Sequence, residues 1–164
     1  MKVLLILRHG KSSWKHPGLA DHDRPLNKRG LRDAPRMGRL LREEDLAPDR
    51  IVSSTAVRAR ETARLAAGEA GHGAAVKHSR RLYLASVAEI IRVLGEVGSD
   101  ASRLLVVGHN PGLEELVACL TGCAETLPTA ALVQVELDLQ SWSKLEESTP
   151  ARLVNLWRPR ELLR

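Results

Sequence analysis

The feature that most constrains the fold is an unbroken run of five aliphatic residues, Val3 to Leu7, followed directly by Arg8, His9 and Gly10. A continuous apolar run indicates a strand that is covered on both faces, as in the middle of a parallel α/β sheet. Ligands of open α/β sheets bind beyond the carboxyl ends of such strands. We therefore expect the cation, the imidazole and the glycine that follow the run to face a substrate.

The rest of the chain alternates predicted strands and helices. Strands are predicted at 51–54, 75–78, 103–107, 130–139 and 152–157, and helices at 56–69, 86–97, 111–120 and from Asn27 to just before Leu46. This order predicts a three-layer α/β/α sandwich with a mainly parallel, partly mixed central sheet. With 164 residues, the chain is predicted to form a single domain, 1–164.

Polar and proline residues mark the predicted ends of two helices. Asn27 is a plausible N-cap of the first helix, and Pro35 is expected either to kink this helix or to mark its true first turn. Asn110 is expected to cap the last helix, with Pro111 in its first helical position. His109 would then lie between the end of a strand and the start of a helix.

The composition excludes several functional classes. The chain has no Phe, three Trp and one Tyr, so it offers few of the aromatic platforms on which base-stacking nucleic-acid readers depend. Its net charge of +5 favours anionic partners.

Cys119 and Cys123 are too few for structural zinc or a disulfide framework, and His16, His22 and Asp23 are more simply interpreted as exposed loop residues than as metal ligands. No apolar run has transmembrane length and no signal-peptide layout follows Met1, so we expect no membrane association and a cytoplasmic location.

Residues of one chemical character follow three separate strands. Arg58 falls in the first turn of the helix after strand 51–54, and His109 follows strand 103–107, so one crevice would combine them with Arg8 and His9. Two guanidiniums hold the oxygens of a phosphoryl group well, and a neutral imidazole can attack its phosphorus to form a phosphohistidine that water cleaves. The flanking guanidiniums favour neutral His9 near pH 7. We predict that His9, Arg8, Arg58 and His109 are catalytic.

A second phosphate motif is excluded by its spacing. Gly10-Lys11-Ser12 has the sequence of the end of a P-loop. That motif requires a glycine five residues before Gly10, and Leu5 occupies the position, inside the strand. The match is therefore interpreted as coincidental.

Five ordered blocks resemble a known family, and together they span nearly the whole chain: LLILRHGKSSW, DHDRPLNKRG, IVSSTAVRARETA, LYLAS and LLVVGHNPGLEEL. The chain resembles the histidine phosphatase superfamily, which has the phosphoglycerate mutase-like fold, and within it the small phosphohistidine phosphatases of the SixA type. The resemblance implies that His9 is the phosphorylated nucleophile, that Arg8 and Arg58 bind phosphate, and that His109 is the fourth pocket residue. It also implies that no metal or organic cofactor takes part. Gly10 and Lys15 complete the predicted substrate-binding set.

The departures from the family pattern concern the substrate. Larger members that act on phosphate esters carry an acidic proton donor before the middle helix, whereas residues 76–88 contain no Asp or Glu, and Glu89 already fits a capping box with Ser86. An alkoxide leaves poorly without a proton, but the imidazole of a phosphohistidine leaves readily. Mutase-like members also have Asn at the position of Lys15. These departures predict a phosphatase for phosphohistidine on a protein surface, the partner being a phosphotransfer or phosphocarrier domain.

Several alternatives remain open from the sequence. The nearest is a phosphatase for small phosphate esters with Asp21, Asp23 or Glu89 as its acid, and a further one is a non-catalytic phosphate-binding signalling module. Nucleic-acid binding is the weakest. The loop from Lys11 to Asp23 and a stripe of arginines on the first helix are candidate docking surfaces, although a solvated helix face is the simpler interpretation of the stripe. The stripe consists of Arg29, Arg32, Arg36 and Arg39.

Overall fold

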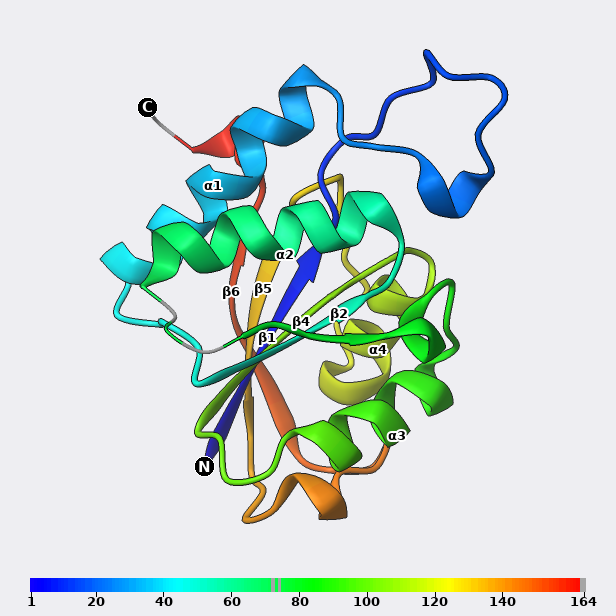
Figure 1. Cartoon of the computed structure of the whole chain (residues 1–164). Helices are drawn as coiled ribbons and strands as arrows, with labels where there is room; N and C mark the ends of the chain where they lie inside the picture. Colours follow the sequence, from blue (N-terminus) through cyan, green and yellow to red (C-terminus); the bar gives the residue numbers. More distant parts are fainter. Residues whose placement is uncertain (72, 74, 163–164) are drawn as a thin grey trace.

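The computed structural model describes residues 1–71, 73 and 75–162, and these residues build a six-stranded sheet between two pairs of helices (Figure 1). The strands are β1 (Lys2–Arg8), β2 (Arg50–Ser54), β3 (Lys77–Ser79), β4 (Arg103–Gly108), β5 (Leu132–Leu137) and β6 (Ala151–Trp157). The helices are α1 (Lys28–Glu43), α2 (Val57–Ala70), α3 (Val87–Val97) and α4 (Gly112–Thr121). Short 3-10 helices lie at Asp21–Asp23, Arg80–Leu82, Trp142–Lys144 and Pro159–Glu161.

The sheet has the strand order β3-β2-β4-β1-β5-β6. β3, β2, β4 and β1 are parallel neighbours, whereas β5 is antiparallel to β1 and β6 is antiparallel to β5. The predicted α/β class, with a mainly parallel sheet and antiparallel pairing toward the C-terminus, is confirmed. The two strands with the longest aliphatic runs, β1 and β4, lie next to each other in the middle.

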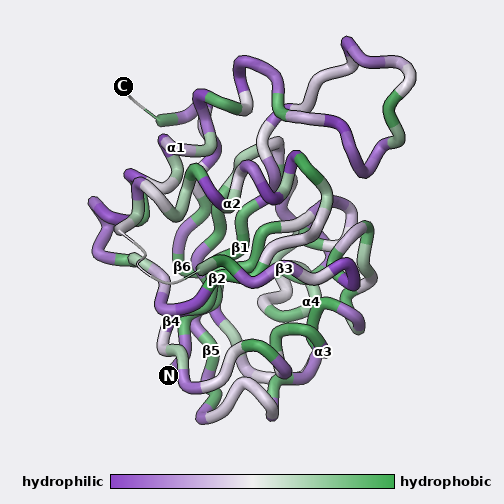
Figure 2. Tube along the Cα trace, in the orientation of Figure 1, coloured by the Kyte–Doolittle hydropathy of each residue, from purple (hydrophilic) through white to green (hydrophobic). Residues whose placement is uncertain are grey.

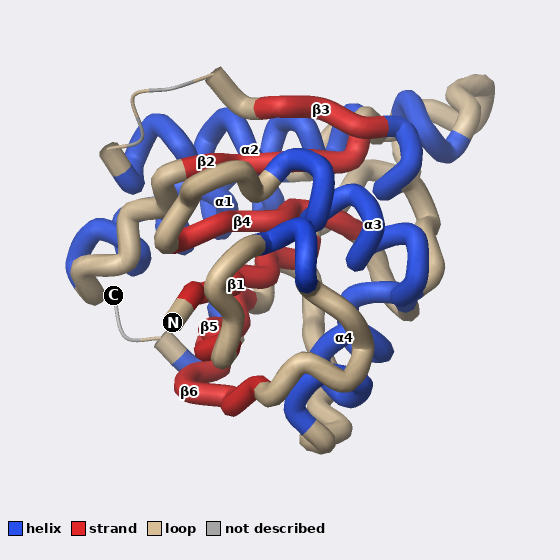
Figure 3. Tube along the Cα trace, turned by 90° about the horizontal axis from the view of Figure 1, so that it is seen from below, coloured by secondary structure: helices blue, strands red, loops and turns tan. Residues whose placement is uncertain are grey.

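Each face of the sheet has its own hydrophobic core. Leu5 and Leu7 of β1 pack in the core that contains Met37 and Leu41 of α1 and the alanines of α2, whereas Leu4 and Ile6 pack in the core under α3 and α4. Figure 1 shows α1 and α2 on the opposite side of the strands from α3 and α4, Figure 3 shows the strands side by side from β3 to β6, and in Figure 2 the part of β1 beside its label is hydrophobic. This double burial is the reason why β1 has no polar alternation.

The structure of the first helix excludes one of the two roles expected for Pro35. Asn27 caps α1, since its Oδ1 accepts a hydrogen bond of 3.0 Å from the Gly30 N–H. Pro35 lies inside the helix, seven residues after its first residue, Lys28. The proposal that Pro35 marks the first turn is therefore wrong, because the Asn27 cap starts the helix two turns earlier.

The start of α4 also differs from the prediction. Pro111 is the N-cap and α4 begins at Gly112, so Pro111 is not in the first helical position. Asn110 lies outside the helix, although its Oδ1 still accepts a hydrogen bond from the Glu114 N–H at 3.3 Å. Its Nδ2 donates to Leu127 O and to Glu114 Oε2. Asn110 is therefore not the N-cap that was expected, but its side chain ties the start of α4 to the loop before β5.

The boundaries of the other elements are close to the predicted ones. β5 begins at Leu132 instead of 130, because Ala130 has a left-handed φ of 63° that an extended strand does not allow. β3 covers Lys77–Ser79 in place of 75–78. The predicted domain spans 1–164, of which residues 72, 74, 163 and 164 lie outside the described residues. Within the described part, no helix has the length and apolarity needed to cross a membrane.

The contact between α1 and α2 depends on a glycine. A Cβ added to Gly38 of α1 would lie 2.2 Å from Ala66 O and 2.8 Å from Ala66 Cα. Both are backbone atoms of α2, which cannot move aside as the end of a flexible side chain can. The two helices approach this closely only because residue 38 has no side chain.

We expect Gly38→Ala to lower the free energy of unfolding by about 2 kcal/mol or more, since overpacking of a rigid contact outweighs the gain in helix propensity. The matched control is Gly68→Ala in α2, where an added Cβ meets nothing within 4 Å. That substitution should be neutral or stabilising by up to about 1 kcal/mol. Urea unfolding of both variants measures the difference, and equal effects would contradict the packing account.

Candidate active site

The pairing of β1 with β4 brings two histidines together. Arg8 and Gly108 are the last register partners of the two parallel strands, so His9 and His109 are the next residues on each chain. The His9 N–H donates to Gly108 O at 3.1 Å, and the two imidazole ring centroids are 5.1 Å apart. Both side chains are buried, with relative exposures of 7% for His9 and 4% for His109. Two residues separated by one hundred positions therefore form one site at the carboxyl end of the sheet.

The two arginines approach the same point from different elements. Arg8 ends β1, and its Nη1 donates to Leu127 O at 2.9 Å, in the loop before β5. Arg58 is the second residue of α2, which follows the end of β2, and its residue exposure is 4%. A guanidinium at this place adds to the partial positive charge of the helix N-terminus.

The tautomer of His9 follows from its hydrogen bond. His9 Nδ1 lies 2.7 Å from Gly10 O, and a carbonyl oxygen only accepts, so Nδ1 carries the proton and Nε2 has the free lone pair. Burial lowers the pKa of His9 to about 4, and the charges of Arg58, Arg8 and Arg24 act in the same direction. Near pH 7 the imidazole is therefore neutral, with Nε2 as a nucleophile.

His109 is fixed by the end of β2. Its Nε2 lies 2.8 Å from Ser54 Oγ, while Nδ1 is buried without a hydrogen-bond partner among the described residues. Burial, followed by the nearby His9 and Arg58, lowers the pKa of His109 to about 3. Arg8 Nε is likewise buried and unpartnered within the described part of the chain. Unpaired polar atoms in a buried site are costly unless a ligand satisfies them.

A carboxylate from the loop after β1 holds Arg58. Arg58 Nη1 donates to Asp21 O at 2.7 Å, and Arg58 Nη2 donates to Asp21 Oδ2 at 2.9 Å. The Tyr83 hydroxyl donates to the same Oδ2, and Arg24 Nη1 donates to Oδ1. The hydrogen bond from Tyr83, then those from Arg58 and Arg24, holds the pKa of Asp21 far below its usual range. Asp21 is therefore ionised at neutral pH and positions Arg58.

These residues open into a cavity of about 240 Å³. Its charged lining residues are all cationic, and among the described residues that line it there is no Asp or Glu. A concave site with several guanidiniums, an ammonium and two neutral imidazoles is complementary in charge and in hydrogen-bond donors to a compact dianion such as phosphate. The lining consists of Arg8, His9, Lys11, Ser12, Trp14, Arg24, Arg58, Leu84, His109, Asn110 and Thr129.

Two predicted substrate-binding residues do not line this cavity. The Gly10 N–H donates to Thr62 Oγ1 at 2.9 Å, and a Cβ on Gly10 would lie 3.0 Å from Gly30 Cα, so this glycine serves the packing of β1 against α1 and α2. Lys15 is exposed in the loop after β1, where its backbone N–H donates to Ser13 Oγ at 3.1 Å. Lys11 lines the cavity in its place.

Sequence reasoning missed the residues that act through tertiary contacts. Ser54, Thr62 and Asp21 hold His109, Gly10 and Arg58 respectively, but nothing in their spacing connects them with those partners. Asp21 was considered only as a possible acid. Trp14 and Arg24 line the cavity from the loop between β1 and α1, whose residues 11–23 the sequence suggested only as a docking surface.

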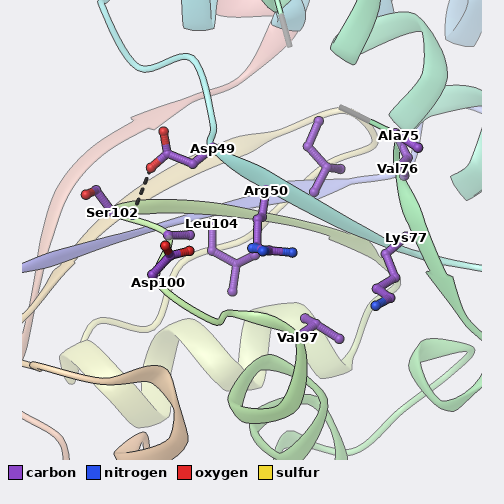
Figure 4. Close-up of a pocket in the computed structure, with 11 residues that line it drawn as sticks. Asp49, Arg50, Ala75, Val76, Lys77, Val97, Asp100, Ser102 and Leu104 are labelled. Carbon is purple, nitrogen blue, oxygen red and sulfur yellow. Dashed lines mark hydrogen bonds between the residues drawn. The ribbon is translucent and has the colours of Figure 1, made fainter. Parts of the chain in front are cut away.

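A larger cavity lies at the opposite end of the sheet. It has a volume of about 790 Å³, and Figure 4 shows Arg50, Lys77, Val97 and Asp100 around it. Arg50 is the first residue of β2 and Asp100 precedes β4, so this cavity adjoins the amino ends of the parallel strands. Among the described residues that line this larger cavity there is no His, whereas His9 and His109 line the smaller one.

Metal binding finds no support in the arrangement of ligands. In the described part of the chain, no group of three or more His, Cys, Asp or Glu side chains is placed to hold an ion. His22 Nε2 lies 2.8 Å from Thr55 Oγ1, and its Nδ1 is 3.5 Å from Asp23 Oδ1.

The comparisons with known proteins agree with this geometry. The model of the histidine phosphatase superfamily (branch 1) matches residues 4–83, which begin within β1 and include α1, β2, α2 and β3. An uncharacterized protein of Mycobacterium tuberculosis is 39% identical over 120 residues, 73% of each chain. A candidate phosphohistidine phosphatase SixA of Nakamurella multipartitia has a solved structure that superposes with a TM-score of 0.85 over 96% of both chains, at 28% identity.

The chain belongs to the histidine phosphatase superfamily. A 2,3-bisphosphoglycerate-dependent phosphoglycerate mutase of Thermobifida fusca is also similar, 44% identical over 85 residues that make up 50% of this chain and 34% of the mutase. Similarity therefore extends to members with ester substrates, but over only part of their length. The substrate of this histidine phosphatase has to be inferred from its own cavity.

The lowered pKa of His9 makes the stability of this histidine phosphatase sensitive to acid. The folded chain keeps His9 neutral down to about pH 4, whereas the unfolded chain binds a proton below the ordinary value of 6.5. Stability should therefore decrease as the pH falls from about 6.5 to about 4, with a contribution from His9 of about 1.4 kcal/mol per pH unit.

The measurement is urea unfolding across this pH range, in buffer without phosphate, for the wild type and for His9→Asn. The wild type should lose stability more steeply, and the difference between the two slopes isolates His9 from the other titrating groups. Parallel slopes would mean that His9 titrates normally in the folded state.

Proposed function

We propose that this histidine phosphatase hydrolyses protein phosphohistidine through a phosphorylated His9. His9 Nε2 attacks the phosphorus, and the P–N bond to the substrate imidazole breaks as the new P–N bond forms. The substrate histidine leaves with the bonding electron pair and takes up a proton from solvent. Water then attacks the phosphorus on His9, and the P–N bond to Nε2 breaks with its electron pair returning to Nε2. The proton of the water goes to the phosphate or to solvent, so that inorganic phosphate and neutral His9 result.

The cationic residues stabilise the phosphoryl group during both steps. Arg58 uses two of its five N–H donors on Asp21, which leaves three for phosphoryl oxygens. Arg8 has its buried Nε and its second Nη group for the same purpose, and His109 has Nδ1. Groups that are already fixed before the substrate binds need little reorganisation in the transition state.

The single observation that carries the choice of substrate is the lack of a protonatable carboxyl group in the lining of the cavity, as far as the chain is described. A phosphate ester leaves as an alkoxide and needs a general acid, whereas an imidazole leaves without one. Asp21 is ionised and bound to Arg58, so it holds no proton to donate. Glu89 is ion-paired with Arg81 and Arg92 on the surface, and Asp23 is exposed.

A phosphatase of small phosphate esters is the second candidate, favoured by the similarity to phosphoglycerate mutases. It would need a proton donor that arrives with the substrate or from solvent. The two candidates share the covalent intermediate and differ only in the leaving group. A non-catalytic phosphate-binding module is disfavoured by the free Nε2 lone pair of neutral His9, which phosphate binding alone does not require.

We expect a radiolabelled phosphohistidine peptide to leave label on His9 when the reaction is quenched in base, and the label to be lost in acid. His9→Ala should abolish both labelling and turnover while phosphate still binds. Arg58→Ala should lower kcat/KM on the order of a hundredfold, by analogy with the loss of an oxyanion-stabilising donor.

The ratio of kcat/KM for free phosphohistidine to that for alkyl phosphates decides between the two substrates. A higher kcat/KM for the alkyl phosphates would identify esters, not phosphohistidine, as the substrate. Label on another residue would show that His9 is not the nucleophile. Gly68→Ala is the matched control for handling and folding, because its site is remote from the cavity lining.

The arginine stripe of α1 supports a protein partner with an acidic surface. Two adjoining cavities, of about 550 and 310 Å³, share Arg32, Pro159 and Arg160 and form what we call the arginine groove. Thr129 lines both the smaller of these cavities and the catalytic cavity. The charged lining residues of the groove are Arg29, Arg32, Asp33, Arg36, Arg39, Glu43 and Arg160.

The groove keeps a surplus of positive charge after its internal ion pairs are counted. Buried Asp33 pairs with Arg32 and Arg36, whereas Arg29 and Arg160 have no ion pair with any described residue. Arg29 and Arg39 are ten residues apart, so the stripe is about 15 Å long. An extended acidic segment of about five residues, next to the phosphohistidine, has the length to follow it.

We expect peptides with six Glu beside the phosphohistidine to be hydrolysed with a higher kcat/KM than matched six-Lys peptides at low salt, by about tenfold, and the advantage to disappear at high salt. Arg29→Glu/Arg160→Glu should remove the advantage while free phosphohistidine is hydrolysed as before. The control is Arg64→Glu/Arg92→Glu, at exposed positions of α2 and α3. An equal effect of the control would show that only net charge matters.

A further inference from the structure

The outer rim of the catalytic cavity is apolar, unlike its cationic interior. Trp14 and Leu84 line the cavity, yet they are 74% and 57% exposed. Large side chains that remain this exposed beside a charged pocket indicate a contact surface for a ligand. Trp14 comes from the loop after β1 and Leu84 from the segment before α3, so two distant parts of the chain supply the rim.

Trp14 is supported from one side by a buried guanidinium. Arg24 Cζ lies 3.2 Å from the centroid of the Trp14 ring. All three nitrogens of the Arg24 guanidinium donate hydrogen bonds to other groups. Nε donates to Ser13 O at 3.1 Å, Nη1 to Asp21 Oδ1 at 3.1 Å and Nη2 to Ser12 Oγ at 2.6 Å. Arg24 is 8% exposed. Its planar group is therefore fixed by hydrogen bonds in its plane, and its face positions the indole.

The same carboxylate connects this support with the phosphate pocket. Asp21 binds Arg24 through Oδ1 and Arg58 through Oδ2. The position of the Trp14 ring is thereby fixed relative to the guanidinium that faces the phosphoryl group. One face of the indole is covered by Arg24, and the high exposure of the side chain leaves the other face open to a ligand.

Leu84 reaches the rim through an unusual backbone conformation. Its φ is 52°, in the left-handed region that residues other than Gly, Asn and Asp rarely adopt. The preceding residue, Tyr83, is anchored by its hydroxyl to Asp21. Such strain persists where neighbouring contacts hold it, and it clusters at sites of function.

We propose that Trp14 and Leu84 form a subsite for the leaving group that binds a planar ring, the imidazole of the phosphohistidine. The proposal rests on the proposed function and adds a reason for its selectivity. With the phosphoryl group between Arg8, Arg58 and His109, the scissile P–N bond points outward to the rim, where the imidazole stacks on the open face of the indole. A phosphoramidate without a ring, such as phospholysine, makes no such contact.

The experiment compares kcat/KM for phosphohistidine and phospholysine as free amino acids in the wild type, Trp14→Ala and Trp14→Phe. The wild type should prefer phosphohistidine. Trp14→Ala should lower the ratio of the two values by about three- to tenfold, the size of one aromatic contact, and Trp14→Phe should restore most of it. The inhibition constant of inorganic phosphate shows in each variant that the interior of the pocket is intact.

Leu31→Ala, at a position of α1 that is 47% exposed, is the matched control and should leave the ratio unchanged. An unchanged ratio in Trp14→Ala, or equal losses for both substrates, would overturn the subsite. A wild type that hydrolyses only esters would overturn the proposed function instead. In that case, kcat/KM for phenyl phosphate and for ethyl phosphate is compared in the same variants. A preference for phenyl phosphate that is lost in Trp14→Ala supports the subsite, and a preference that stays unchanged overturns it.

Discussion

The site depends on the parallel pairing of β1 with β4. This register places Arg8 opposite Gly108, and therefore His9 beside His109, at a point where both strands have just left the hydrophobic interior. A shift by one residue would turn the side chains of β1 to the opposite faces of the sheet and exchange its two cores. The same apolar contacts that fold the chain thus set the distance between the two imidazoles.

The electrostatics of the cavity follow from this placement. Both imidazoles are neutral because burial and neighbouring guanidiniums oppose a further positive charge. The Gly10 carbonyl then decides which nitrogen of His9 keeps the proton. The result is a nucleophile surrounded by cations, which suits an incoming dianion and a leaving group that needs no acid.

Much of this arrangement was predictable from local patterns, and the rest was not. The aliphatic runs before Arg8 and His109 predicted the central strands, because continuous burial leaves a simple pattern in the sequence. Gly10 and Lys15 were predicted to bind the substrate, but the first packs against Gly30 and the second lies in an exposed loop. Asp21 was considered only as an acid, since its bond to Arg58 joins residues 37 positions apart and no periodicity reports such a contact.

Asp21 also couples the loop after β1 to the pocket. This one carboxylate bonds with Arg24 of its own loop, with Arg58 of α2 and with Tyr83 before α3. Phosphoryl oxygens that bind the three remaining N–H donors of Arg58 would share this guanidinium with Asp21. Ligand occupancy and loop conformation are therefore thermodynamically linked, so that whatever stabilises the loop alters the affinity of the pocket and, by reciprocity, a bound phosphoryl group alters the order of the loop.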